Sequence, residues 1–137
     1  MLNLPIIVVL DTNILTVPAQ FSVDIFAESE RVVERRIEFV VLKSVIEELE
    51  TKLEVAVRTE KFKFRIALDF VERCTIIGLD EVTSAKPVDD QVLEYALSVN
   101  GVIATNDKEL REKSLKRGVP VLFMRGKKRL ELQGTIR

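Results

Sequence analysis

The sequence predicts an α/β fold in three layers, with a mainly parallel central sheet of about five strands between helices. Three observations predict this fold. The chain has 137 residues, runs of β-branched residues alternate with segments of helical period, and the first run, Ile6–Leu10, is continuously apolar. A continuous apolar run is typical of a strand that is buried on both faces of a parallel sheet. Because one domain usually takes about 100–200 residues, we expect a single domain over residues 1–137.

The remaining elements follow in order from apolar periodicity and from turn signals. After the first strand we predict helix 23–36, strand 37–42, a helix of about three turns from Ser44, helix 60–73, strand 75–79, helix 89–99, strand 102–105, helix 107–116 and strand 120–124. Pro87 marks a helix start, whereas Asn100-Gly101 and Gly118 mark helix ends. The tail, residues 126–134, either adds a short edge strand or lies along the surface.

The composition excludes several classes of function. With 21 Lys and Arg against 22 Asp and Glu, the formal net charge is −1, so a polyanion must be bound by a local patch. The chain contains no His, which excludes a Ser-His-Asp triad, a Cys-His dyad, His-ligated zinc and an imidazole base. The first apolar run is too short for a membrane span and lacks the basic segment of a signal peptide. We therefore expect a cytoplasmic protein that has no membrane partner.

Carboxylates follow the predicted strands at the edge where open α/β sheets bind their ligands. These residues are Asp11, Glu47, Glu48, Asp89, Asp90 and Asp107. Converging carboxylates repel one another unless a divalent cation neutralises them, and hard oxygen ligands favour Mg²⁺ or Mn²⁺. Such sites carry out phosphoryl transfer or phosphodiester hydrolysis.

Helix capping offers a purely structural explanation for some of these acids, since helix N-termini favour Asp and Glu. Ser44 and Glu47 have the spacing of a capping box, which leaves Glu48 on the flank of the apolar stripe as the better site candidate. Asp11 is the hardest to explain structurally. It ends a buried apolar strand, where a charge is costly unless it is paired or bound to a metal.

The other two acidic positions have similar alternatives. Asn106 and Glu109 also have capping-box spacing, which places Asp107 at the first helical position, where the helix dipole alone would favour it. At the Asp89-Asp90 doublet, Asp89 is a candidate cap and Asp90 a candidate ligand.

Motifs for other phosphate chemistry are absent from the sequence. It contains neither G-x-G-x-x-G nor G-x-x-x-x-G-K-[ST], so neither a Rossmann dinucleotide site nor a P-loop is expected. Haloacid dehalogenase-type hydrolases need a second Asp where Asn13 stands. A response-regulator receiver needs an acidic pair at the first strand end, where Asp11 is single. Both remain minor alternatives.

Four segments, in order, resemble the PIN-domain ribonucleases. They are Val8-Val9-Leu10-Asp11-Thr12-Asn13, Val45-Ile46-Glu47-Glu48-Leu49, Asp89-Asp90-Gln91-Val92-Leu93 and Ile103-Ala104-Thr105-Asn106-Asp107. The resemblance covers nearly the whole chain and implies a Mg²⁺- or Mn²⁺-dependent endoribonuclease acting on single-stranded RNA. It implies catalytic, metal-holding roles for Asp11, Glu48, Asp90 and Asp107, with hydrogen bonds from Asn13 and from Thr105 or Asn106. Family spacing favours Asp90 over Asp89 and Glu48 over Glu47, which stay as alternates.

RNA also requires cationic contacts, for which the candidates are Arg125, Lys127, Lys128 and Arg129. A second basic cluster, Lys61, Lys63 and Arg65, is interpreted as a solvated helix face.

Two groups of PIN proteins look similar to this chain: VapBC-type toxins, which have an antitoxin protein as partner, and nucleases of ribosomal-RNA processing. Residues 118–121 and the basic tail look more like the second group. The resemblance also implies a homodimer. The alternative function is a catalytically weak RNA- or protein-binding module of the same fold.

Overall fold

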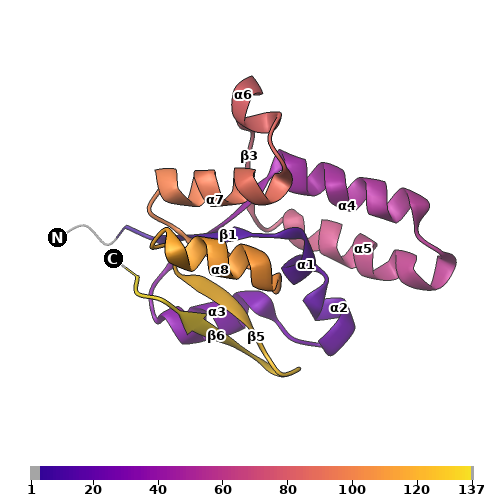
Figure 1. Ribbon diagram of the computed structural model, residues 1–137. Coiled ribbons are helices and arrows are strands. Elements are labelled where there is room, and N and C mark those ends of the chain that lie inside the picture. The colour runs from indigo at the N-terminus through magenta and orange to yellow at the C-terminus, as the bar shows by residue number, and fades with distance from the viewer. Residues whose placement is uncertain (1–3, 137) are drawn as a thin grey trace.

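The computed structural model of the protein describes residues 4–136 and has three layers, with the sheet in the middle (Figure 1). The sheet order is β3-β2-β1-β4-β5-β6. The strands are β1 (Ile6–Leu10), β2 (Ile37–Leu42), β3 (Thr75–Ile77), β4 (Val102–Ala104), β5 (Val121–Arg125) and β6 (Arg129–Gln133). Neighbouring strands are parallel except β5 and β6, which form an antiparallel hairpin.

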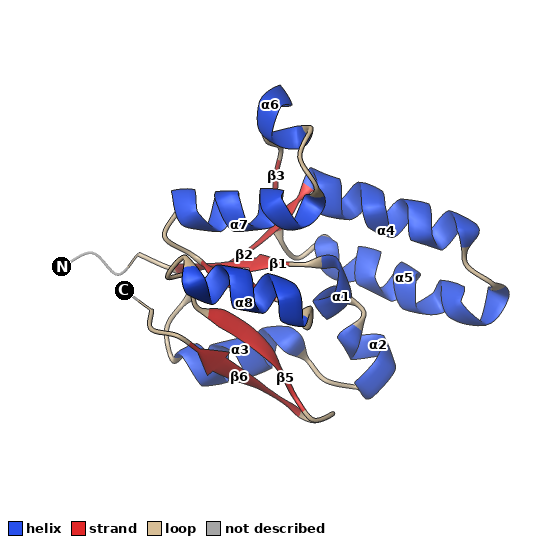
Figure 2. Cartoon of the chain, in the orientation of Figure 1, coloured by secondary structure: helices blue, strands red, loops and turns tan. Residues whose placement is uncertain are grey.

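Helices cover both faces of the sheet (Figure 2). They are α1 (Thr12–Leu15), α2 (Val17–Phe21), α3 (Ile25–Val33), α4 (Lys43–Val55), α5 (Arg58–Val71), α6 (Glu81–Ser84), α7 (Val88–Ser98) and α8 (Lys108–Lys116). One face is covered by α7 and α8, which pack on β1, β4 and β5. On the other face Phe26 of α3 packs edge-on against Phe39 of β2, with ring centroids 4.7 Å apart, and stacks on Phe70 of α5 at 5.3 Å.

The central strand β1 explains the position of the core. Val8, Val9 and Leu10 have no exposed surface, as the continuous apolar run predicts for a strand between two helical layers. Burying each such side chain contributes roughly 1.5–3 kcal/mol before the entropy of ordering is subtracted. The α/β fold class and its mainly parallel sheet are confirmed.

The tail forms the edge strand β6, which is one of the two alternatives given for it, so the sheet has six strands rather than about five. Three short helices were missed: α1, α2 and α6. Each has four or five residues, which is too short to show a helical period in the sequence. Within residues 4–136, no helix is both long enough and apolar enough to cross a membrane.

The parallel strands bring distant segments to one edge of the sheet. Because β1, β2, β4 and β5 run in the same direction, their carboxyl ends lie along this edge. Asp11 follows β1, Thr105 follows β4, and the turn of the β5–β6 hairpin follows β5. The α4–α5 pair projects beyond the same edge (Figure 1). This edge therefore holds the candidate site.

Candidate active site

Asp11 is the most buried carboxylate of the candidate site, with 4% of its surface exposed. Its Oδ1 accepts a hydrogen bond of 2.8 Å from the backbone N–H of Thr12, and its Oδ2 accepts one of 2.7 Å from Thr105 Oγ1. Burial raises the pKa of Asp11 to about 6, although both hydrogen bonds lower it; the charges of Asp89 and Glu48 raise it further. Asp11 thus lies in an environment that disfavours its negative charge.

A network of hydrogen bonds holds this carboxylate in place. Thr105 Oγ1 also lies 3.3 Å from Asn13 Oδ1 and accepts a bond of 3.0 Å from the backbone N–H of Asp107. Asn13 Oδ1 in turn accepts a bond of 2.9 Å from the N–H of Asn106. Since Thr105 has no exposed surface, its orientation is fixed by these contacts. The structure therefore brings Asn13, Thr105 and Asn106 together beside Asp11.

Glu48 approaches this group from α4, whereas Glu47 does not. The charge of Glu48 acts on both Asp11 and Asp89, raising the pKa of each. Its side chain also lies 3.7 Å from the ammonium of Lys52, one turn further along α4. Glu47 is exposed and lines a separate cavity of about 190 Å³ with Ser44. Of this doublet, the structure places Glu48 near Asp11.

The predicted capping box at Ser44 is wrong. Helix α4 begins at Lys43, directly after β2, so Ser44 already lies inside the helix. No side chain among residues 4–136 caps α4, and Ser44 Oγ has no hydrogen-bond partner among them. Glu48 is instead placed by helical phase. It directly precedes Leu49, which is buried together with Val45 on the inner face of α4.

The structure places Asp89, and not Asp90, near the other acids. Burial raises the pKa of Asp89, and the charges of Asp107 and Glu48 raise it further. Asp90 lines a different cavity with Lys86 and Arg117, and its charge raises the pKa of Lys86. This arrangement favours Asp89, the alternate of the doublet, although the charge of Asp90 also raises the pKa of Asp89.

The helical phase of α7 explains why Asp89 and Asp90 point in different directions, and this phase can be worked out from the sequence alone. Val92, Leu93 and Ala96 define the buried face of α7. At about 100° per residue, Asp89 falls in the middle of that face and Asp90 about 100° away from it. Asp89 is not a cap, because Pro87 precedes the helix and Asp89 is its second residue.

Asp107 belongs to both the helix and the acid group. Its Oδ1 caps α8 by accepting a bond of 3.0 Å from the N–H of Leu110, so Asp107 is the N-cap and the predicted capping box at Asn106 is wrong. The Asn106 side chain instead accepts a bond of 2.8 Å from the N–H of Met124 on β5. Capping leaves the charge of Asp107 in place, where it raises the pKa of Asp89.

Asp11 and the three neighbouring acids Glu48, Asp89 and Asp107 are named here the acid cluster. Two lysines offset part of the negative charge of the acid cluster. Lys113 lowers the pKa of Asp89, and Lys52 lies within ion-pair distance of Glu48. Carboxylate oxygens are the ligands that Mg²⁺ and Mn²⁺ prefer, so the donor chemistry fits such an ion. No three acidic side chains within residues 4–136 lie close enough together to enclose a metal ion as they stand. Binding one would thus require side-chain rotation.

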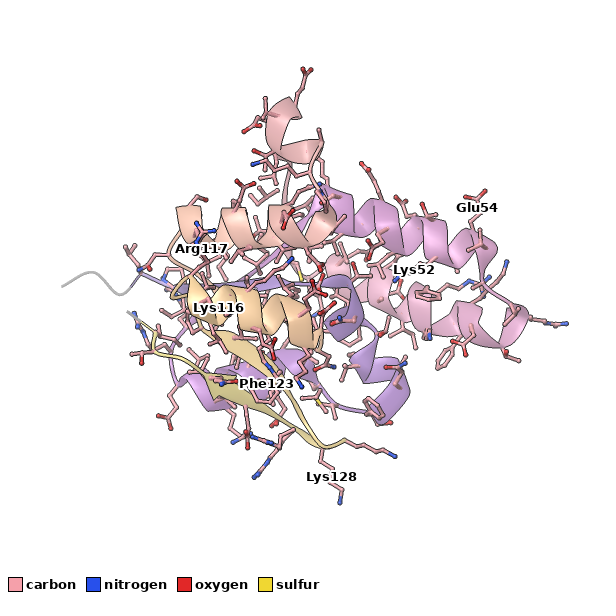
Figure 3. All side chains as sticks on the ribbon, viewed as in Figure 1. Lys52, Glu54, Lys116, Arg117, Phe123 and Lys128 are labelled. Carbon is pink, nitrogen blue, oxygen red and sulfur yellow. The ribbon has the colours of Figure 1, made fainter. Side chains whose placement is uncertain are left out.

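The four predicted RNA-contacting residues all lie at the tip of the β5–β6 hairpin: Arg125, Lys127, Lys128 and Arg129. Figure 3 shows Lys128 at the end of this hairpin, directed away from the sheet. Arg125 Nε lies 2.9 Å from Glu131 Oε2, and Arg129 lies 3.6 Å from the same carboxylate. The hairpin tip therefore carries a net positive charge at the edge that holds the acid cluster.

Comparison with known proteins assigns the family. The sequence profile of the "PIN like domain" matches residues 8–127. Ribonuclease VapC4 of Methanocaldococcus jannaschii is 32% identical over 132 residues, which cover 94% of this chain and 98% of that protein. Ribonuclease VapC9 of Archaeoglobus fulgidus is 32% identical over 123 residues, covering 89% and 85%.

Solved structures show the same fold. The PIN domain endonuclease Utp24 superposes with a TM-score of 0.76 at 21% identity, over 96% of this chain and 94% of that one. VapBC2 from Rickettsia felis, bound to a DNA fragment from its promoter, superposes with a TM-score of 0.63 at 17% identity, over 88% and 100%. The profile match, the two VapC relatives and the shared fold agree, and this chain belongs to the PIN-domain family.

Proposed function

We propose that this protein is an endoribonuclease that hydrolyses phosphodiester bonds of single-stranded RNA and depends on Mg²⁺ or Mn²⁺. The observation that carries the proposal is the buried Asp11 carboxylate, whose pKa of about 6 reflects burial beside other negative charges. A buried, like-charged acid group is costly in a structural role, but it suits a site that holds a cation. The curated relatives named ribonucleases support RNA as the substrate.

In the proposed mechanism Asp11, Glu48, Asp89 and Asp107 would hold the ion. A divalent ion in such a site supplies positive charge that activates water and stabilises the leaving oxygen. Thr105 orients Asp11 by donating to its Oδ2, and Asn13 lies behind Thr105, so the Asp11 carboxylate keeps one direction. The acids would fix the ion and do not contact bases, so any sequence preference must come from residues outside the acid cluster.

We also propose a cellular role as the toxin of a VapBC-type pair. Both curated relatives are named VapC, and two of the similar solved structures are VapBC complexes. An antitoxin protein would then be the partner that keeps the nuclease inactive, and two copies of the chain would form a homodimer. Expression of the chain alone should arrest growth, and light scattering should give twice the chain mass. Growth without arrest would favour RNA processing instead.

The nuclease proposal is tested with purified protein and end-labelled single-stranded RNA in the presence of Mn²⁺. We expect the wild type to cut the RNA, and both EDTA and the Asp11→Asn substitution to abolish cutting. Asp90→Asn is the matched control, because it removes one carboxylate of the same doublet outside the acid cluster. Equal cutting by the wild type and by Asp11→Asn would refute the proposal.

Metal titration in the absence of RNA distinguishes the proposed nuclease from the alternative, a binding module with little catalysis. A nuclease of the proposed kind takes up Mn²⁺ in a stoichiometric amount that depends on Asp11. A binding module shows no such uptake, although it binds RNA or protein.

A further inference from the structure

An arginine on α8 is held against an aromatic ring next to the hairpin. The guanidinium carbon of Arg111 lies 4.3 Å from the centroid of the Phe123 ring, and that of Arg125 lies 5.6 Å from the same centroid. Phe123 is 7% exposed and lies on β5 between α8 and β6 (Figure 3). A guanidinium over an aromatic face is attracted to it and keeps its N–H groups directed outward at its edges.

The charges on this surface are not balanced. Along the hairpin, Phe123 pairs with Glu131 and Arg125 with Arg129, so these side chains share the face that α8 covers. Glu131 is the carboxylate within ion-pair distance of both Arg125 and Arg129. Arg111 forms no ion pair with any acidic residue in the part of the chain that the structure describes. Two guanidinium groups thus share one carboxylate, and the guanidinium group of Arg111 lies over the neighbouring Phe123 ring.

Arg111 also lies close to the acid cluster. It follows Asp107 by four residues on α8, so the two side chains project from nearly the same side of the helix about 6 Å apart along its axis. Asp107 is the member of the acid cluster at the start of α8, and the hydrogen bond from Met124 N–H to Asn106 ties that start to β5. Arg111 therefore lies about one helical turn from the acid cluster, on the side of α8 that faces Phe123 of β5.

We propose that Arg111, held in place by Phe123, binds a phosphate of the RNA strand next to the phosphodiester that is cut. This inference rests on the proposed ribonuclease function and places the neighbouring phosphate at the surface between α8 and β5. The planar guanidinium presents two parallel donors to phosphate oxygens, and holding it before binding lowers the entropy cost of the contact. Arg111 is a binding residue in this proposal and does not take part in the bond cleavage.

The experiment measures binding without cleavage. All proteins carry Asp11→Asn and are kept in EDTA, and a short fluorescein-labelled oligouridylate is titrated by fluorescence anisotropy at increasing KCl concentration. For single strands, the slope of log K against log salt changes by about 0.7 for each phosphate contact. We expect Arg111→Gln to weaken binding and to reduce the slope by about 0.7, whereas Arg111→Lys keeps the slope because it keeps the charge.

Two further variants separate this contact from general charge and from packing. Lys116→Gln removes a positive charge at the opposite end of α8 (Figure 3) and should leave the slope unchanged. Phe123→Leu keeps every charge, so weaker binding by this variant, with a melting curve that shows a folded protein, supports the role of the ring in holding Arg111.

The outcomes are distinct. The inference is overturned if Arg111→Gln keeps the parent slope, or if Lys116→Gln lowers the slope as much as Arg111→Gln does. Unchanged affinity in Phe123→Leu overturns the role of the ring. If the parent protein binds no RNA at any salt concentration although the wild type cuts RNA in Mn²⁺, this inference alone is overturned. If the wild type does not cut RNA in Mn²⁺, the proposed function itself fails.

Discussion

Replacing Asp11 by Asn should stabilise the fold at neutral pH when no divalent ion is present. Burial and the neighbouring charges raise the pKa of Asp11 from 3.8 to about 6. At about 1.36 kcal/mol for each pKa unit, this difference corresponds to roughly 3 kcal/mol of stability lost when the buried acid ionises. Asn resembles the neutral acid, but its amide must replace one of the two accepted hydrogen bonds. We therefore expect a gain of about 1–3 kcal/mol.

The pH dependence fixes the sign of this effect. Between pH 3.8 and about 6 the native protein holds a proton on Asp11 that the unfolded chain has lost. Stability from this group is therefore fully present below pH 3.8 and falls as the pH rises through about 6. The Asn variant lacks this titration, so the stability difference between the two proteins should be small at acid pH and reach its full size above pH 6.

The assay is urea unfolding of both proteins in EDTA at a series of pH values. Taking the difference between the two proteins cancels the titration of groups far from Asp11, such as Glu28 and Asp80, whose pKa values are lowered. The reasoning is refuted if the difference does not change with pH, or if Asp11→Asn is the less stable protein above pH 6.

Three further results are expected. Mn²⁺ at about 100 times its dissociation constant should stabilise the wild type by about 2.7 kcal/mol, seen as a higher melting temperature, and should not shift Asp11→Asn; equal shifts would place the ion elsewhere. Asp89→Asn should abolish RNA cutting in a gel assay while Asp90→Asn keeps it, and the reverse result would restore Asp90 to the site. Gly101→Ala should lower the free energy of unfolding by about 1–3 kcal/mol, seen as a lower urea midpoint, because a Cβ there would lie 2.9 Å from the backbone oxygen of Ile7; an unchanged midpoint would contradict this close packing.

The sequence was most informative where one pattern covers several residues. The apolar run of β1 and the alternation of strands with helices predicted the parallel sheet, because burial on both faces selects such runs. For the tail that forms the antiparallel strand β6, the sequence did not decide between an edge strand and a surface segment. Its alternation of charged and apolar residues fits both. The helix start at Lys43 was missed because β2 passes into α4 without a loop, so no turn residue marks the boundary.

The acid doublets show where local motifs fail. Capping-box spacing suggested roles for Ser44 and Asn106 that the structure does not assign to them. The neighbouring elements decide instead, since β5 offers a backbone N–H to Asn106 and no partner reaches Ser44 within the described residues. Helical phase, a property of the whole helix, places Asp89 in the acid cluster, whereas the spacing of the family motif had favoured Asp90.

The hydrogen bond between Thr105 and Asp11 joins residues that are 94 positions apart. During synthesis, a ribosome must therefore have made most of the chain before Asp11 can meet its partner, and Asp107 arrives later still. Contacts of such long range form late and together. An emerging or partly degraded chain would lack the assembled acids, so in a cell that must protect its own RNA, any nuclease activity would be confined to the finished fold.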